Sequence, residues 1–258
     1  MRRLFFLLPL LLPVSGSAQV AGTRFTLDVT VNSVVMRGDT AQVTYILYNR
    51  PQSQDSVFMF VVDAPARVRY IPRPQPSSLW LVDSLIHVSE PAAFWSMLSY
   101  LAPSASTPSL QFESVGLPGV VTNWAIGKWP IKTCCDDDPP GSGENVLVTR
   151  SVQSKTVGVE LWPSDRSSQA LLARLRTLTQ NGCSTPLSWI TDSSLCAQLI
   201  ADIDAAEGFR ASGSGSQVQS TIDHYTSLLG TSASFAPGVT SPAFWLLSSN
   251  AGIIRAMF

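Results

Sequence analysis

The stretch Phe25-Thr26-Leu27-Asp28-Val29-Thr30-Val31-Asn32 places an apolar side chain at every odd-numbered position and a polar one at every even-numbered position. Because successive side chains of a β-strand point to opposite faces, this alternation predicts a strand with one buried face. The period of two recurs as far as Leu161, in short segments separated by turns rich in Pro, Gly and Ser. Short strands without intervening helices predict an antiparallel β-sandwich over residues 19–163.

Turn residues divide this region into further strands. Arg37-Gly38-Asp39 leads into a second alternating segment over 42–47, and the near-continuous apolar run at 57–62 suits a central strand. The remaining expected strands are 68–71, 79–82, 93–98, 110–115, 120–126, 146–149 and 156–161.

After Pro163 the apolar period changes to that of a helix. Three apolar faces recur at helical spacing, and Thr191 or Asp192 can cap the second helix. Ser241 followed by Pro242 suits the N-cap and first position of a fourth helix over 243–257. We expect these helices to pack as a small α-helical bundle over residues 164–258. The three expected faces are Leu171, Leu172, Leu175 and Leu178; Leu195, Leu199, Ile203 and Ala206; and Val218, Ile222, Tyr225 and Leu229.

The chain has four cysteines, and in an oxidising compartment an even number favours disulfides. A bond between Cys183 and Cys196 would close a loop between the first two expected helices and stabilise the bundle by about 3 kcal/mol. Cys134 and Cys135 are adjacent, and a bond between neighbours needs a strained peptide. They could be a free pair, or one of them could bridge to another chain.

The N-terminal segment has the pattern of a signal peptide. Arg2 and Arg3 precede an apolar run over 4–14, and small residues follow at 15–18, which predicts cleavage after Ala18. The apolar run is too short for a membrane-spanning helix, and no second run of sufficient length follows. We therefore expect a secreted or periplasmic protein with no transmembrane segment in its mature part.

The charge of the chain is nearly balanced. It has 17 basic and 18 acidic residues, and removing Arg2 and Arg3 leaves 15 basic ones. Because no basic cluster stands out, we expect no nucleic-acid partner. Charged residues make up only 14% of the chain, whereas hydrophobic residues at 45% can supply a proper core.

Motifs for catalysis are scarce. The two histidines are His87, in an apolar strand context, and His224, which we expect at the surface of the third helix. Asp223 adjoins His224, but neighbouring residues on a helix point in different directions and do not form a dyad. The chain has no nucleophile elbow, zinc-protease helix or phosphate-binding loop. We therefore expect no catalytic residues and no resident cofactor.

One acidic cluster and two tryptophans are candidates for binding. Asp136, Asp137 and Asp138, with Glu144 beyond them, could hold Ca²⁺, although their spacing is not that of an EF-hand and a solvated loop tip is the favoured interpretation. Most of the seven tryptophans are expected in the core or between domains, with Trp162 at the junction and Trp189 inside the cystine loop. The pair that could stack against a ligand, such as a sugar ring, is Trp124 and Trp129.

Two resemblances add to this interpretation. Residues Ser167 to Phe258 resemble the FIVAR-like helical hairpin module of secreted bacterial proteins, which implies a spacer or attachment element. The segment from Gly38 to Tyr45, with Asn49 after it, is similar to immunoglobulin-like domains of bacterial surface proteins. The first resemblance rests on Leu171–Leu175, Cys183, Trp189–Thr191, Leu195-Cys196, Asp204–Glu207, His224-Tyr225, Phe244–Leu247 and Asn250-Ala251.

The sequence thus predicts an exported, non-catalytic binding or structural module of the bacterial cell envelope or extracellular space. Its partner would be an unknown protein or a glycan. Two alternatives remain open at this point. One is a secreted hydrolase with a site in the sandwich loops, and the other is a carbohydrate-binding module, because sandwiches carry all three functions.

Overall fold

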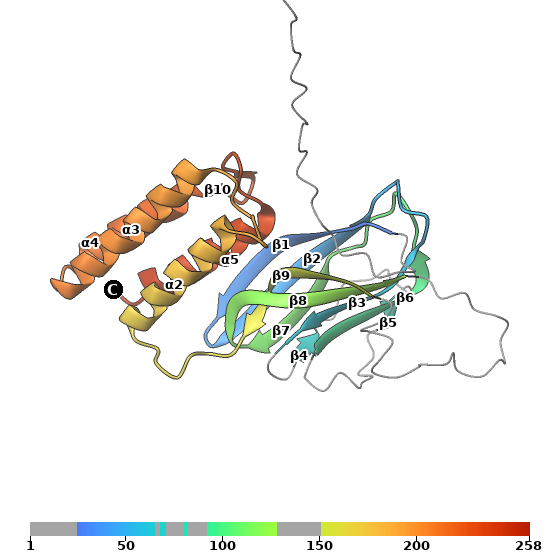
Figure 1. The fold of residues 1–258 in the computed structure, drawn as a ribbon. Helices are drawn as coiled ribbons and strands as arrows, with labels where there is room; N and C mark the ends of the chain where they lie inside the picture. The colour runs from blue at the N-terminus through green and yellow to red at the C-terminus, as the bar shows by residue number, and fades with distance from the viewer. Residues whose placement is uncertain (1–24, 65–67, 71–79, 82–91, 128–150) are drawn as a thin grey trace, which may run out of the picture.

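The computed structural model describes residues 25–64, 68–70, 80–81, 92–127 and 151–258, which form two large antiparallel sheets, a two-stranded hairpin and four helices (Figure 1). The first sheet has the order β1 (Leu27–Arg37), β2 (Thr40–Asn49), β7 (Leu110–Val115) and β4 (Val68–Tyr70). The second sheet has the order β5 (Trp80–Leu81), β6 (Ala92–Leu101), β3 (Val57–Asp63), β8 (Leu117–Gly127) and β9 (Ser151–Glu160).

The strands largely follow the predicted positions. The opening alternation forms β1, and the segment at 110–115 has the predicted limits. The strands β6, β8 and β9 extend beyond their predicted ranges, because backbone pairing continues where the alternation of side chains weakens. The predicted strand at 146–149 lies outside the described residues.

A buried aromatic cluster joins the inner faces of the two sheets. The ring of Tyr45 on β2 lies 5.8 Å from that of Phe60 on β3, 6.1 Å from that of Trp95 on β6 and 6.2 Å from that of Phe112 on β7. The Tyr45 hydroxyl donates a hydrogen bond of 2.6 Å to the carbonyl of Val157 on β9. Burial raises the pKa of Tyr45 well above its usual value, so this hydroxyl stays a donor.

The four helices are α2 (Ser168–Cys183), α3 (Ser193–Ala211), α4 (Gly215–Leu228) and α5 (Ser241–Arg255). All three predicted apolar faces are buried, which confirms them. Asp192 caps α3 through hydrogen bonds from two backbone N–H groups, whereas the predicted cap of α5 is wrong by one residue. There Thr240 is the N-cap, and Pro242 stands in the second helical position, which Pro also tolerates because its N–H is not needed.

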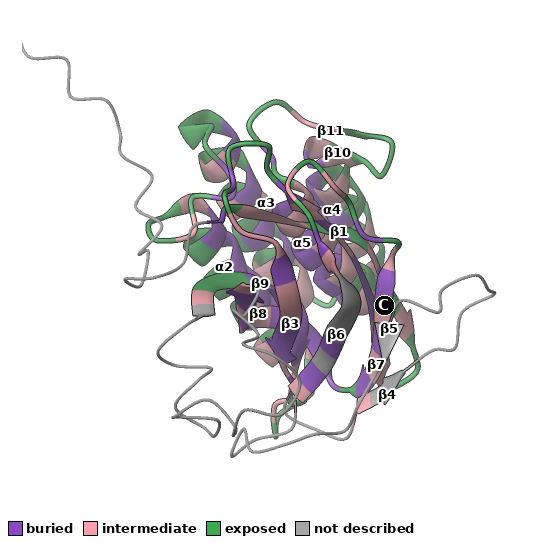
Figure 2. Cartoon of the chain, turned by 90° about the vertical axis from the view of Figure 1, so that its right-hand side faces the viewer, coloured by how far each residue is buried: buried purple, intermediate pink, exposed green. Residues whose placement is uncertain are grey.

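The helices pack against the sheets as well as against each other. Figure 1 shows α2 and α5 beside the sheets and α3 and α4 farther out, and α5 contacts β1, β8 and β9. A short hairpin of β10 (Gly230–Thr231) and β11 (Ser234–Phe235) connects α4 to α5. One cluster of buried hydrophobic residues runs through strands and helices alike (Figure 2). The division into two domains at residue 163 stays a prediction.

The disulfide between Cys183 and Cys196 is present and joins the end of α2 to the start of α3, as predicted. Its two cysteines are separated by 13 positions. Cys134 and Cys135 lie outside the described residues, so their state stays open. No helix of the described residues is long and apolar enough to cross a membrane.

Removing the disulfide tests its contribution to the bundle. We expect the double variant Cys183→Ser, Cys196→Ser to lose about 3 kcal/mol of unfolding free energy, because the closed loop restricts the unfolded chain. Urea unfolding with and without a reducing agent measures this loss. Under reduction, the wild type should match the variant. A loss below about 1 kcal/mol would contradict the loop-closure argument.

Candidate functional site

A groove of about 380 Å³ lies where the edge strands of the two sheets meet the helical part. One wall is the first half of β1, a second is the middle of β9, and the third is made by the loop before α3 and the start of α5. Apolar, hydroxyl and charged side chains all contribute to it. The lining residues are Leu27, Asp28, Val29, Thr30, Ser154, Lys155, Trp189, Thr240, Ser241 and Pro242.

The β1 wall presents backbone groups to the groove. The carbonyl of Thr26 accepts a hydrogen bond of 2.9 Å from the N–H of Arg50. This bond shows which residues of β1 direct their backbone groups toward β2. In an antiparallel pair, every second residue directs its N–H and C=O away from the partner strand. Leu27, Val29 and Val31 therefore direct these groups toward the outer edge of β1.

Two serines of α5 occupy the second half of this edge. Ser241 donates its hydroxyl to the carbonyl of Val31, and Ser249 donates to the carbonyl of Val34 at 3.5 Å. A β-bulge between Val31 and Ser33 shifts the register by one residue, so that both carbonyls face α5. The helix thus satisfies acceptors that a further strand would otherwise bind, but only beyond Thr30.

The β9 wall has unusual polar atoms behind it. Ser154 donates a hydrogen bond of 3.0 Å to the amide oxygen of Asn123 on β8. The Asn123 side-chain NH₂ and the Thr156 hydroxyl are buried and have no hydrogen-bond partner among the described residues. Buried polar groups normally have partners, so these two atoms call for an explanation. Lys155, next to Ser154, donates to the hydroxyl of Thr122 at 2.8 Å.

The charges of the groove are not balanced. The Asp28 carboxylate accepts from the Arg50 guanidinium, with 2.7 Å between Arg50 Nη2 and Asp28 Oδ1, and this contact raises the pKa of Arg50. Lys155 is exposed, and no carboxylate of the described residues lies within ion-pair distance of it. Lys155, whose ammonium lies against Thr122 on β8, is thus the charged lining residue that no carboxylate of the described residues balances.

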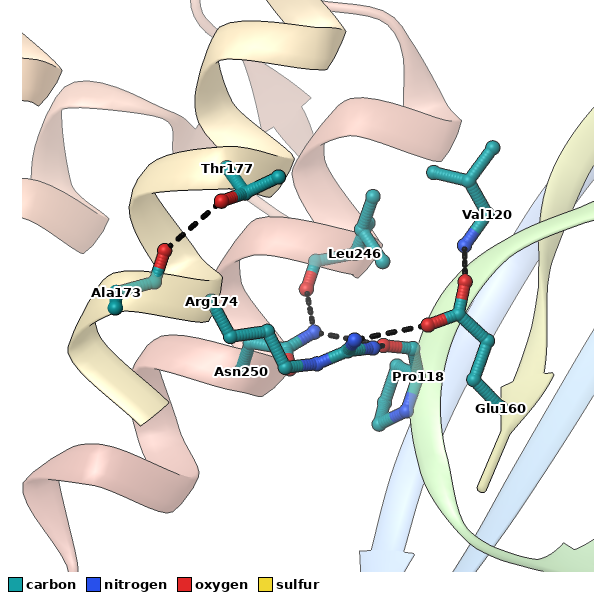
Figure 3. A network of polar contacts seen from close by, with 8 residues as sticks. All are labelled: Pro118, Val120, Glu160, Ala173, Arg174, Thr177, Leu246 and Asn250. Carbon is teal, nitrogen blue, oxygen red and sulfur yellow. Dashed lines mark hydrogen bonds and ion pairs between the residues drawn. The ribbon is translucent and has the colours of Figure 1, made fainter. Parts of the chain in front are cut away.

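The helical wall is held in place by a network at the other end of the interface (Figure 3). Arg174 on α2 donates from Nη2 to the carbonyl of Pro118 at 2.9 Å, and its Nη1 lies 2.8 Å from the Glu160 carboxylate. The second oxygen of Glu160 accepts from the N–H of Val120 at 3.0 Å. One arginine therefore connects α2 to both β8 and β9.

Asn250 on α5 adds a second connection in the same network. Its amide NH₂ donates to the carbonyl of Pro118 at 3.0 Å and to that of Leu246, one turn earlier in α5, at 2.8 Å (Figure 3). The Pro118 carbonyl thus receives hydrogen bonds from two helices. Because Asn250 is buried, this contact fixes α5 against the sheet.

The residues singled out from the sequence lie mostly elsewhere. Trp124 is half-buried on β8 and does not line the groove, and Trp129 lies outside the described residues. Within the residues that the structure describes, no group of three or more His, Cys, Asp or Glu could hold a metal ion. The Ca²⁺ prediction stays untested, because its residues also lie outside that part of the chain: Asp136, Asp137, Asp138 and Glu144.

His224 is exposed on α4, as predicted, but it has a partner that the sequence did not suggest. Its Nδ1 lies 2.8 Å from a carboxylate oxygen of Asp202 on α3, while the adjacent Asp223 binds Arg255. This pair lies on the helical part, away from the groove lining. His87 lies outside the described residues, so a hydrolase site involving it is untested.

The sequence predicted a strand over 27–30, a helix start at Ser241 and Pro242, and Trp189 inside the cystine loop, but it assigned none of these groove residues to a binding site. Trp189 is largely buried and lines the groove as well. The sequence did not predict that Lys155 lines the groove or that Asn123 lies behind its β9 wall, because nothing in a sequence shows which strands form the edges of a sheet. The alternation in β1 predicted its buried face and not its free edge.

Comparison with known proteins adds little. No family model matches the chain, and no curated protein matches it. Nine chains of solved structures match, among them an uncharacterized protein from Nocardia farcinica that is described as having an immunoglobulin-like fold. It is 9% identical over 50% of this chain and 95% of its own, with a TM-score of 0.26. At that score the two folds superpose too poorly to support an inference.

The Arg174 network predicts how firmly the helical wall is held. We expect Arg174→Met to lower the unfolding free energy by about 2 kcal/mol, because it leaves the half-buried Glu160 carboxylate without its cation. Arg37→Met is the matched control, since Arg37 is 67% exposed and 3.8 Å from Glu113, and it should cost below about 1 kcal/mol. Denaturant unfolding of both variants measures this difference. Equal losses would show that the network does not anchor the helices.

Proposed function

We propose that this chain is an exported, non-catalytic binding module of the bacterial cell envelope or extracellular space, and that it binds its partner in the groove between β1, β9 and α5. The observation that carries the proposal is the groove itself. Within the part of the chain that the structure describes, it combines a strand edge without a neighbouring strand and a lysine without a carboxylate partner, and both are features of a surface that receives a ligand.

An immunoglobulin-like β-sandwich is the fold we propose for the two sheets. The order β1-β2-β7-β4 corresponds to strands A, B, E and D of that fold, and β9-β8-β3 corresponds to G, F and C. The strands β6 and β5 then extend the second sheet as C′ and C″ do in variable domains, although here β4 precedes them in the chain. The aromatic cluster around Tyr45 lies between the sheets, where antibody domains carry a disulfide.

Export is supported by the disulfide between Cys183 and Cys196, because such bonds persist in oxidising compartments and are rare in the cytosol. The basic and apolar pattern of residues 1–18 is consistent with a signal peptide. Both features support the secreted or periplasmic location that we propose.

For the helical part we keep the FIVAR-like hairpin as a proposal, supported by the Cys-linked connection between α2 and α3. Its contacts with β1, β8 and β9 give it a further task, because α5 forms one wall of the groove. In this proposal the helices shape the binding site and are more than a spacer.

A non-catalytic role agrees with the side chains present. The described lining of the groove contains no His, Cys or Glu, and its one carboxylate, Asp28, is held by Arg50. General acid–base or nucleophilic catalysis requires a titratable or activated group that is free to react with substrate.

Blocking the groove tests the proposal. Thr240 is exposed and makes no side-chain capping bond, so Thr240→Trp should fill the groove without loss of stability. Ser232→Trp, in the exposed turn between β10 and β11, is the control. The mature protein is screened against a random-peptide phage library and a glycan array. We expect wild type and Ser232→Trp to retain the same ligands, and Thr240→Trp to bind them at least about tenfold more weakly.

Two results would count against the proposal. One is ligands that bind Thr240→Trp as tightly as the wild type, which would place the site elsewhere. The other is the absence of any ligand in both panels.

A further inference from the structure

We propose that the occupant of the groove is an extended polypeptide segment of a partner protein, carrying an acidic residue, which adds as a strand to the free half of β1. This inference rests on the proposed function and names the class of partner that the same groove would take. It is carried by the backbone of β1, the shape of the helical wall and the charge of Lys155.

The backbone of β1 supplies the main contacts. Leu27 and Val29 direct their N–H and C=O groups into the groove, and none of these groups has a hydrogen-bond partner among the described residues. They stand two residues apart, about 7 Å along the strand, which is the repeat of an extended chain. A peptide backbone matches this array, and recognition by strand addition uses such an edge.

The helical wall favours binding of a single peptide strand over pairing with the edge strand of another folded protein. Trp189, Thr240 and Pro242 stand beside the free half of β1 and leave a groove of about 380 Å³. A second copy of this protein would bring its own α5 against the same edge, since α5 covers the second half of each β1. Two such edges would collide before their strands paired, whereas a single peptide has no such obstacle.

The charge of the groove selects the side chains of that peptide. Asp28 is neutralised by Arg50, whereas Lys155 on the opposite wall has the hydroxyl of Thr122 as its one partner among the described residues. An acidic residue in the bound segment would pair with Lys155, and a basic one would be repelled. Electrostatic complementarity therefore favours an acidic segment.

The experiment uses the mature chain and two synthetic peptides. The first is an eight-residue segment of alternating threonine and valine with one central glutamate, and the second has lysine in place of that glutamate. We expect the glutamate peptide to bind about tenfold more tightly at low salt, and the preference to reverse in Lys155→Glu. Binding is followed by fluorescence anisotropy of labelled peptides.

The backbone contact has its own variant and its own control. Val29→Pro removes an N–H that β2 does not use, whereas Val29→Ala shortens the same side chain and keeps the N–H. We expect Val29→Pro to weaken binding at least about fivefold more than Val29→Ala does. Hydrogen exchange of wild type should show the Leu27 and Val29 amides slowing at least about tenfold when the peptide is added. This second measurement decides the question even if Val29→Pro does not fold.

Failure of the inference is distinguishable from failure of the proposed function. Glycans that bind in a Thr240→Trp-sensitive manner, with no peptide binding, would overturn strand addition and leave a binding module. A concentration-dependent dimer in sedimentation, with protected Leu27 and Val29 amides in the absence of peptide, would assign the edge to a second copy. Peptide binding without amide protection or charge preference would also overturn the inference.

Discussion

The covering of the β1 edge by α5 is the contact on which the rest of the structure depends. An edge strand presents unpaired N–H and C=O groups, and within the described residues β1 and β9 each form an edge of their sheet, on the same side of the molecule. Ser241 and Ser249 satisfy two of these carbonyls, and α5 also contacts β8 and β9. The helix therefore closes the side of the sheets where neither supplies a neighbouring strand, and the hydrophobic cluster continues from strands into helices.

The position of α5 is fixed at its other end by contacts that permit little variation. The Pro118 carbonyl accepts from both Asn250 and Arg174, and Arg174 also pairs with Glu160. Gly119 allows this arrangement, because a Cβ at that position would collide with the Glu160 side chain lying over it. A backbone glycine, a charge pair and two helices thus meet at the Pro118 carbonyl and connect the third wall of the groove to the sheet.

Local patterns in the sequence were sufficient to predict most elements and few of the contacts between them. The alternation at 25–32 predicted β1, the spacing of Leu171, Leu172, Leu175 and Leu178 predicted the buried face of α2, and Asp192 predicted a helix cap. Each of these signals arises within about ten neighbouring residues. The bond from Arg174 to Pro118 joins residues 56 positions apart, and that from Ser241 to Val31 joins residues 210 apart. No local period encodes such pairs, so neither the β1 edge nor the groove could be predicted.

The groove lies between the edge strands β1 and β9, at the part of the β1 edge that α5 does not cover. Proteins usually protect a free edge, because any extended chain can pair with it. Here serines of α5 bind individual carbonyls on either side of the bulge, at Val31 and Val34, and leave the edge from Leu27 to Thr30 uncovered. At the uncovered half, the wall of Trp189 and Pro242 limits access to a narrow segment, and Lys155 adds a charge that discriminates among segments. One half of the β1 edge is covered by α5, and the groove walls limit which chains reach the other half. Such an edge is poorly suited to pairing with any extended chain and well suited to binding one kind of strand.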